Sequence, residues 1–130
     1  MISNADREAL IAYRFEQAKE TIAVSEFLFN SDKLPVAVNR IYYGIYYALT
    51  ALALKHMFET SKHAQLLGWF NRVFISGNIV DISYGRILRN AFQNRTKSDY
   101  DAYIHFDRTE VAAMLEEMKD FIAMIESLLK

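Results

Sequence analysis

The sequence predicts an all-α protein, an antiparallel four-helix bundle with one short additional helix. Residues that break helices are scarce, with one proline and four glycines among 130 residues. Apolar side chains recur at alternating spacings of three and four residues along most of the chain, as on one face of a helix. No stretch shows the polar–apolar alternation of a strand. The length suits one domain, which we expect to span residues 1–130.

The first two helices are expected to be long. The first runs from Asn4 to Asn30 and is followed by a polar turn at residues 31–33. Pro35 fits the first position of the second helix, where its missing N–H has no partner to lose, and that helix is expected to end near Phe58. The apolar stripes are Ile11, Phe15, Ala18, Ile22, Ser25 and Phe29 in the first helix and Val38, Ile41, Ile45, Leu49 and Leu52 in the second.

Two shorter helices follow. Ser61 is a candidate cap for a helix that continues through Phe70 and stops before the Gly77-Asn78 turn. A fourth helix is expected from Ser83 to Gln93, and the polar residues 94–101 are expected to form a loop, with one helical turn as an alternative for part of it.

The last helix has the clearest amphipathic pattern. Asp107 and Glu110 have the spacing of a capping box at its start. Acidic residues occupy the side opposite to its apolar face. That apolar face consists of Val111, Met114, Leu115, Met118, Phe121, Ile122, Ile125 and Leu129.

Composition excludes several classes of protein. The absence of cysteine rules out a disulfide scaffold, thiol catalysis and cysteine zinc sites. Apolar residues at 52% and charged residues at 24% are typical of a soluble globular domain. We find no pattern of a signal peptide and no apolar run near the ~18 residues of a membrane span. We therefore expect a cytoplasmic protein that does not associate with membranes.

The net charge of −1 hides an uneven distribution. Residues 55–108 carry eight Lys/Arg against five Asp/Glu, and all three histidines lie in this segment. A local positive field attracts phosphate. The imbalance is small, so a chance distribution over solvated faces is the interpretation that we favour.

Residues 39–49 of the second helix form the most informative segment. They place four tyrosines and one arginine on about three turns of helix. Arg40, Tyr43 and Tyr47 share a face that is offset from the main apolar stripe. Because an ordinary surface helix has only one apolar stripe, this second face is expected to contact a partner chain, a ligand or another layer of the domain. We take it as the cleft or dimer face.

Four short motifs occur in order along the chain. They are Arg40-x-Tyr42-Tyr43 with Tyr46-Tyr47-Ala48, then His63, then Phe70-x-x-x-Phe74-x-x-Gly77-x-Ile79, and finally Arg95-x-x-x-Asp99-Tyr100. In this order and at these distances they resemble the HEPN family, small prokaryotic helical domains. The resemblance covers residues 34–130. Ile41 and Gly44 depart from the small residue and the alanine that are usual at these positions.

The resemblance implies a four-helix bundle with a short extra helix, usually a homodimer. It also implies that the motif of the second helix and the arginine loop lie close together near the dimer cleft. Some members of the family are metal-independent ribonucleases, often toxins of toxin–antitoxin pairs. Others are partners of minimal nucleotidyltransferases, and some are thought to bind nucleotides or RNA.

The ribonucleases of the family carry an arginine followed, after four to six residues, by a histidine. Imidazole transfers protons well near neutral pH, and arginine holds the phosphate. After Arg95 these positions hold Tyr-Asp-Ala at residues 100–102, and no other arginine has a histidine at this spacing. His105 follows too late unless the chain folds back. The chain therefore resembles the branch without the motif, and only Arg95, His63 and His105 remain as candidate catalytic residues.

The candidate contacts to a ligand phosphate are Arg40, His63, Arg95, Asp99 and Tyr100. Each has a structural alternative. Arg95 is equally well explained by a salt bridge to Asp99 or Asp101, and a turn cap or a hydrogen-bonded phenol is favoured for Asp99 and Tyr100. For His63 the favoured alternative is a histidine at a helix start, bonded to a carbonyl.

The four tyrosines of the second helix also have two interpretations. Packing in the core or in a dimer is favoured over a platform on which bases stack. No spacing of histidines and glutamates indicates a metal site, and no glycine-rich phosphate loop occurs, so no cofactor is expected.

Three functions remain open. The favoured one is a homodimeric module that binds a nucleotide or RNA, with a nucleotidyltransferase or an antitoxin as its protein partner. The alternatives are an endoribonuclease toxin with a substituted catalytic site, and a structural adaptor. Whether the protein is an enzyme stays open. All three depend on the guanidinium of Arg95 meeting the aromatic side of the second helix.

Overall fold

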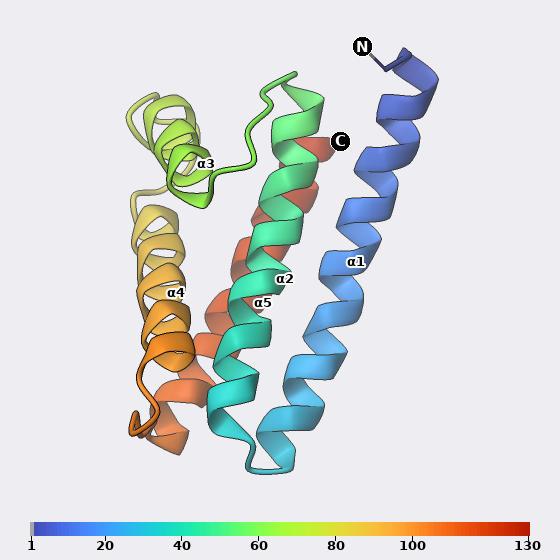
Figure 1. Ribbon diagram of the computed structural model, residues 1–130. Helices are drawn as coiled ribbons and strands as arrows, with labels where there is room; N and C mark the ends of the chain where they lie inside the picture. The colour runs from blue at the N-terminus through green and yellow to red at the C-terminus, as the bar shows by residue number, and fades with distance from the viewer. Residues whose placement is uncertain (1) are drawn as a thin grey trace.

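The computed structural model describes residues 2–130 as five α-helices and one π-helical turn, and it contains no strand within that range. The long helices run alternately up and down, as Figure 1 shows, so the prediction of an all-α antiparallel bundle is confirmed. The helices are α1 (Asn4–Asn30), α2 (Leu34–Lys55), α3 (His63–Phe70), α4 (Ser83–Tyr100) and α5 (Arg108–Leu129), and the π-helical turn, η1, is Asn71–Ile75.

Helix α2 is the centre of the bundle. It packs against α1, α4 and α5, whereas α1 and α4 make no contact with each other in the part of the chain that is described. In Figure 1, α5 lies behind α2, and α1 and α4 flank it. The side of α2 between α1 and α4 is therefore not covered by another helix.

The core forms between α2 and α5 because both have a continuous apolar stripe. Ile45, Leu49 and Leu52 of α2 are fully buried, and so are Phe121 and Ile125 of α5. Burying a side chain of this size stabilises the fold by about 1.5–3 kcal/mol. Asp107 is the N-cap of α5 as expected, but its side chain accepts no capping hydrogen bond, so the predicted capping box does not form.

Two helix boundaries differ from the prediction. Helix α2 ends at Lys55 rather than near Phe58, because Met57 adopts a left-handed conformation with φ of 59°. The cap predicted at Ser61 is wrong, since the N-cap of α3 is Lys62 and no side chain caps this helix.

The prediction of a loop at residues 94–101 is wrong, and the reason lies in contacts between distant parts of the chain. Helix α4 continues through this polar segment to Tyr100. The segment is helical because its inward side chains have partners on α2: Ser98 Oγ donates a hydrogen bond of 2.9 Å to the carbonyl of Pro35, and the guanidinium of Arg95 also reaches α2. Tertiary contacts thus outweigh the low helix propensity of the segment.

Gly44 marks the closest approach of three helices. A Cβ atom built on Gly44 would overlap Cε of Met118 in α5 and lie 3.3 Å from Cγ2 of Thr21 in α1. Met118 is completely buried, so its methyl group occupies the space that an alanine at position 44 needs. This packing explains the glycine at position 44.

We therefore predict that Gly44→Ala and Met118→Ala compensate for each other. Alanine at position 44 gains about 1 kcal/mol of helix propensity, but overpacking against Met118 costs about 1–3 kcal/mol. Gly44→Ala alone should lower the free energy of unfolding, whereas the same change in a Met118→Ala background should raise it by filling part of the cavity. Urea unfolding of the four proteins measures the coupling, and additive effects of the two changes would contradict this account.

Candidate functional site

The uncovered side of α2 carries a row of half-buried polar and aromatic residues. We call Arg40, Tyr43, Tyr46 and Tyr47 the tyrosine face. Their rings contact one another, with centroid distances of 6.0 Å for Tyr43–Tyr46 and 6.1 Å for Tyr43–Tyr47. The guanidinium carbon of Arg40 lies 4.9 Å from the ring centroid of Tyr43, a cation–π distance. The face is therefore a continuous aromatic surface with a cation at one end.

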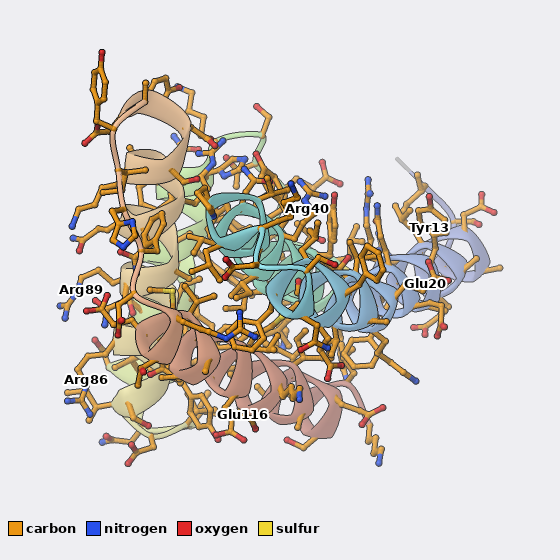
Figure 2. All side chains as sticks on the ribbon, turned by 90° about the horizontal axis from the view of Figure 1, so that it is seen from below. Tyr13, Glu20, Arg40, Arg86, Arg89 and Glu116 are labelled. Carbon is orange, nitrogen blue, oxygen red and sulfur yellow. The ribbon has the colours of Figure 1, made fainter. Side chains whose placement is uncertain are left out.

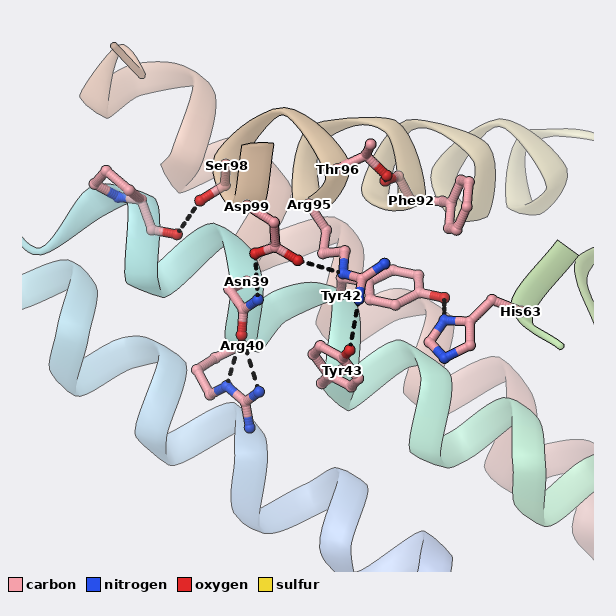
Figure 3. Close-up of polar contacts among 11 residues, drawn as sticks. Asn39, Arg40, Tyr42, Tyr43, His63, Phe92, Arg95, Thr96, Ser98 and Asp99 are labelled. Carbon is pink, nitrogen blue, oxygen red and sulfur yellow. Dashed lines mark hydrogen bonds and ion pairs between the residues drawn. The ribbon is translucent and has the colours of Figure 1, made fainter. Parts of the chain in front are cut away.

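Arg95 reaches this face from α4. Its Nη2 donates a hydrogen bond of 2.8 Å to the phenol oxygen of Tyr43, and its guanidinium carbon lies 5.4 Å from the Tyr43 ring and 5.5 Å from the ring of the buried Tyr42 (Figure 3). Its side chain is only 19% exposed. The structure thus places the guanidinium against the aromatic side of α2, as the sequence predicts.

A carboxylate and an amide hold the two arginines in place. Nε of Arg95 lies 2.9 Å from Oδ2 of Asp99, one turn further along α4. This contact is an ion pair rather than a hydrogen bond, because the buried Nε–H has no acceptor in line with it. Asn39 Nδ2 donates to the other oxygen of Asp99 at 3.0 Å, and Asn39 Oδ1 accepts from Nε and Nη2 of Arg40. Asn39 therefore links Arg40 to Asp99, and no hydrogen bond or ion pair joins Arg40 to Asp99 directly (Figure 3).

His63 joins the site from the first turn of α3. Its Nδ1 lies 2.7 Å from the phenol oxygen of Tyr42, and its ring stacks on Tyr46 with centroids 4.2 Å apart and planes inclined by 16°. Its partner is thus a tyrosine hydroxyl and not the backbone carbonyl that we favoured. Burial raises the pKa of Tyr42, although the charge of Arg95 opposes this, so the phenol stays protonated and can donate to Nδ1. The imidazole proton is then on Nε2.

The site favours neutral side chains next to its fixed cation. Burial lowers the pKa of His63, and the positive charge of Arg95 lowers it further. Burial raises the pKa of Tyr46, which keeps the phenol protonated. His63 is therefore a neutral imidazole at pH 7, and its basic nitrogen, Nδ1, already accepts the hydrogen bond of Tyr42.

Two candidates lie apart from this site. Tyr100 is the last residue of α4 and its side chain is 81% exposed. His105 is exposed in the segment before α5, and no hydrogen bond or ion pair joins it to Arg95. Within residues 2–130 the structure thus brings Arg40, His63, Arg95 and Asp99 together, next to Tyr43 and Tyr47, but not Tyr100 or His105.

Sequence reasoning assigned no role to two residues at the site. One is Asn39, which bridges the arginine and the carboxylate. The other is the half-buried Arg14 of α1, whose charge lowers the pKa of Tyr46 against the effect of burial. Arg14 lies between Ile11 and Ala18 on the predicted apolar side of α1, and a charged residue in such a place is a signal that could have identified it.

The described residues contain no group of three or more acidic or histidine side chains that could hold a metal ion. Within the same range, no helix combines the length and the apolar character needed to cross a membrane.

We predict that Arg95→Gln raises the pKa of His63, because one of the two causes of its low value is removed. NMR titration of the imidazole protons measures this, and Arg89→Gln on the outer side of α4 is the matched control. Between its lowered pKa and about 6.5, the usual value, His63 binds fewer protons in the native than in the unfolded state. Its contribution to stability therefore falls as the pH decreases through this window, and less steeply in Arg95→Gln. An unchanged titration of His63 in Arg95→Gln would contradict the geometry.

Comparison with known proteins agrees with the fold and the motifs. The HEPN domain family matches residues 11–128. A UPF0332 protein of Thermotoga maritima is 30% identical over 125 residues, which are 96% of this chain and 95% of that protein. Two proteins of Methanocaldococcus jannaschii, each named "Putative toxin", are also similar. One is 33% identical over 82% of this chain and 73% of its own length, and the other is 28% identical over 98% and 94%. The chain belongs to the HEPN domain family.

Proposed function

We propose that this protein is a homodimeric module that binds RNA or a nucleotide through its phosphate. The observation that carries the proposal is the position of Arg95, whose guanidinium is fixed against the tyrosine face by Tyr43 and Asp99. A fixed guanidinium binds phosphate with little loss of side-chain entropy.

The charges around Arg95 support an anionic ligand. Arg14, Arg40 and Arg95 border the tyrosine face, and Asp99 is the carboxylate within the network. Among the described residues, no acceptor binds Nη1 of Arg40 or Nη1 of Arg95. Both atoms are accessible to solvent, because neither is among the buried polar atoms that lack a hydrogen-bond partner. These N–H groups are thus accessible donors for phosphate oxygens. The neighbouring tyrosine rings offer apolar surface to a base.

The same face is the proposed dimer interface. It lies on the side of α2 between α1 and α4, where His63 of α3 covers only Tyr46, and Tyr43 and Tyr47 expose part of their rings there. Tyrosine is enriched in protein interfaces because it is large, rigid and polar at one end. Two copies joined along this face would bring two sets of arginines into one groove. The names of the two archaeal relatives support a toxin–antitoxin context, in which an antitoxin or a minimal nucleotidyltransferase is the protein partner.

A ribonuclease toxin with a substituted site is the second candidate function. It is favoured by one observation: a neutral imidazole, His63, and a guanidinium, Arg95, contact the same ring of Tyr42. A neutral imidazole can accept the proton of a ribose 2′-hydroxyl, which in this site requires Nδ1 of His63 to be released from the hydroxyl of Tyr42.

We predict that Arg95→Ala weakens binding of a short single-stranded RNA by about 10- to 100-fold at low salt, which corresponds to the loss of one charge-assisted hydrogen bond. The dependence of log K on log salt should become less steep by about one. Arg89→Ala is the matched control, because this arginine lies on the same helix and points away from the bundle (Figure 2). Equal weakening by both variants would place the phosphate elsewhere.

The RNA recovered from the same titrations separates the three functions. Intact RNA with an Arg95-dependent affinity supports the binding module. Fragments that disappear in His63→Ala would assign the ribonuclease instead. A dimer that binds neither RNA nor ATP at low salt would leave the structural adaptor.

We further predict that Tyr47→Glu converts the dimer into a monomer, because it places two like charges in a desolvated interface. Light scattering coupled to size-exclusion chromatography measures the mass. Phe27→Glu is the control, since Phe27 is 69% exposed on α1 and belongs to no part of the tyrosine face. A monomeric wild type, or a Tyr47→Glu dimer, would argue against this interface.

A further inference from the structure

A hollow adjoins the tyrosine face at the end nearer to α3. It has a volume of about 260 Å³ and lies between α1, the second half of α2 and the segment that follows α2. Tyr46 and Tyr47 belong both to its wall and to the tyrosine face, and Arg14 also lines it. The hollow and the phosphate site are therefore neighbours.

We propose that this hollow binds a guanine base, of an RNA or a nucleotide whose phosphate lies on the arginines. This inference rests on the proposed function and adds the identity of the base. The volume is below the range of about 300–1,000 Å³ that is typical of pockets for whole small molecules, so it suits a base better than a complete nucleotide.

The walls fit the flat faces of a base. Tyr47 and Phe58 contribute aromatic rings, and Leu54 and Leu66 contribute aliphatic surface. Tyr46 is held in place by the stacked ring of His63. Stacking of one base on an aromatic side chain contributes about 1–3 kcal/mol and does not select among bases. The selection must come from the polar groups of the wall.

The polar groups of the lining include donors, which are Arg14 and the hydroxyls of Tyr46 and Tyr47, and acceptors, which are the two threonines and Glu59. The hydroxyl of Thr50 donates to the carbonyl of Tyr47. The hydroxyl of Thr60 donates to Oε1 of Gln65 and accepts from the backbone N–H of Lys62, so each threonine can only accept a further hydrogen bond. Glu59 is an exposed residue of the lining, and no ion pair or hydrogen bond engages its carboxylate within residues 2–130. Its two oxygens are thus free to accept hydrogen bonds from a base bound in the hollow.

Guanine matches this carboxylate best. Its N1–H and N2–H₂ groups are donors on adjacent atoms, which two carboxylate oxygens can accept side by side. Adenine and cytosine offer one amino group beside a ring acceptor, and uracil offers one N–H between two carbonyls. A ring acceptor or a carbonyl facing Glu59 would meet a negative charge. Glu59 therefore favours guanine by attraction and rejects the other bases by repulsion.

The test compares four RNA hexamers that differ only in one central base, UUGUUU, UUAUUU, UUCUUU and UUUUUU, by fluorescence anisotropy with the full chain. We expect UUGUUU to bind about 5- to 100-fold more tightly than the others, the discrimination of one bidentate pair. Glu59→Gln should abolish this preference. Since removing a negative charge strengthens binding of every RNA, the readout is the ratio of affinities and not the affinity itself. Glu20→Gln is the control, an exposed glutamate on α1 (Figure 2).

Each result has one meaning. Equal binding of the four hexamers, still weakened by Arg95→Ala, overturns the guanine hollow and leaves the proposed function intact. A guanine preference that persists in Glu59→Gln overturns the role of the carboxylate and with it this inference. Absence of binding to all four at low salt removes the proposed function and the inference together.

Discussion

The contact of Arg95 with α2 determines both the position of α4 and the chemistry of the site. The last two turns of α4 are polar and contribute little to the core. They are held against α2 by polar contacts, among them Arg95 with Tyr43 and Ser98 with the carbonyl of Pro35. A guanidinium that is 19% exposed is costly without partners. The phenol of Tyr43 and the carboxylate of Asp99 supply them, so the same residue stabilises the helix and presents a cation on the open side of α2.

This dependence on distant partners explains where the fold could be predicted. Helix α1 begins at Asn4 and ends at Asn30, as the sequence predicts from the spacing of its apolar residues and from the polar turn that follows. Both signals are local in the sequence. The sequence predicts a loop where α4 ends, because the residues that stabilise this end of the helix are about 60 residues away in sequence. The spacing of 63 between Ser98 and Pro35 is an example. The π-helical turn after Phe70 has no local signal either, since Asn71–Ile75 follows α3 directly, with no proline or glycine between them.

The sequence motifs predict most of the residues that meet at the site. Arg40, His63, Arg95 and Asp99 meet as the family resemblance implies, although the motif treats Asp99 and Tyr100 alike. On a helix, adjacent residues point about 100° apart. When Asp99 faces Asn39 and Arg95, Tyr100 must therefore point away from them, and it is exposed. A sequence motif does not specify the directions of its side chains. These directions follow only once the segment is known to be helical.

The geometry also bears on whether this site cleaves RNA or only binds it. Cleavage through the ribose 2′-hydroxyl needs a base for that proton and an acid for the leaving oxygen. His63 is poorly suited to either step, because burial and Arg95 oppose its protonated form and its Nδ1 accepts the hydrogen bond of Tyr42. The carboxylate that could stabilise an imidazolium, Asp99, is engaged by Arg95 and Asn39 instead. Tyr42 cannot serve as the acid while its hydroxyl is bonded to His63 in a buried position. The cluster thus has guanidinium groups that suit a phosphate and no free pair of proton-transferring groups, which supports the proposed binding over catalysis.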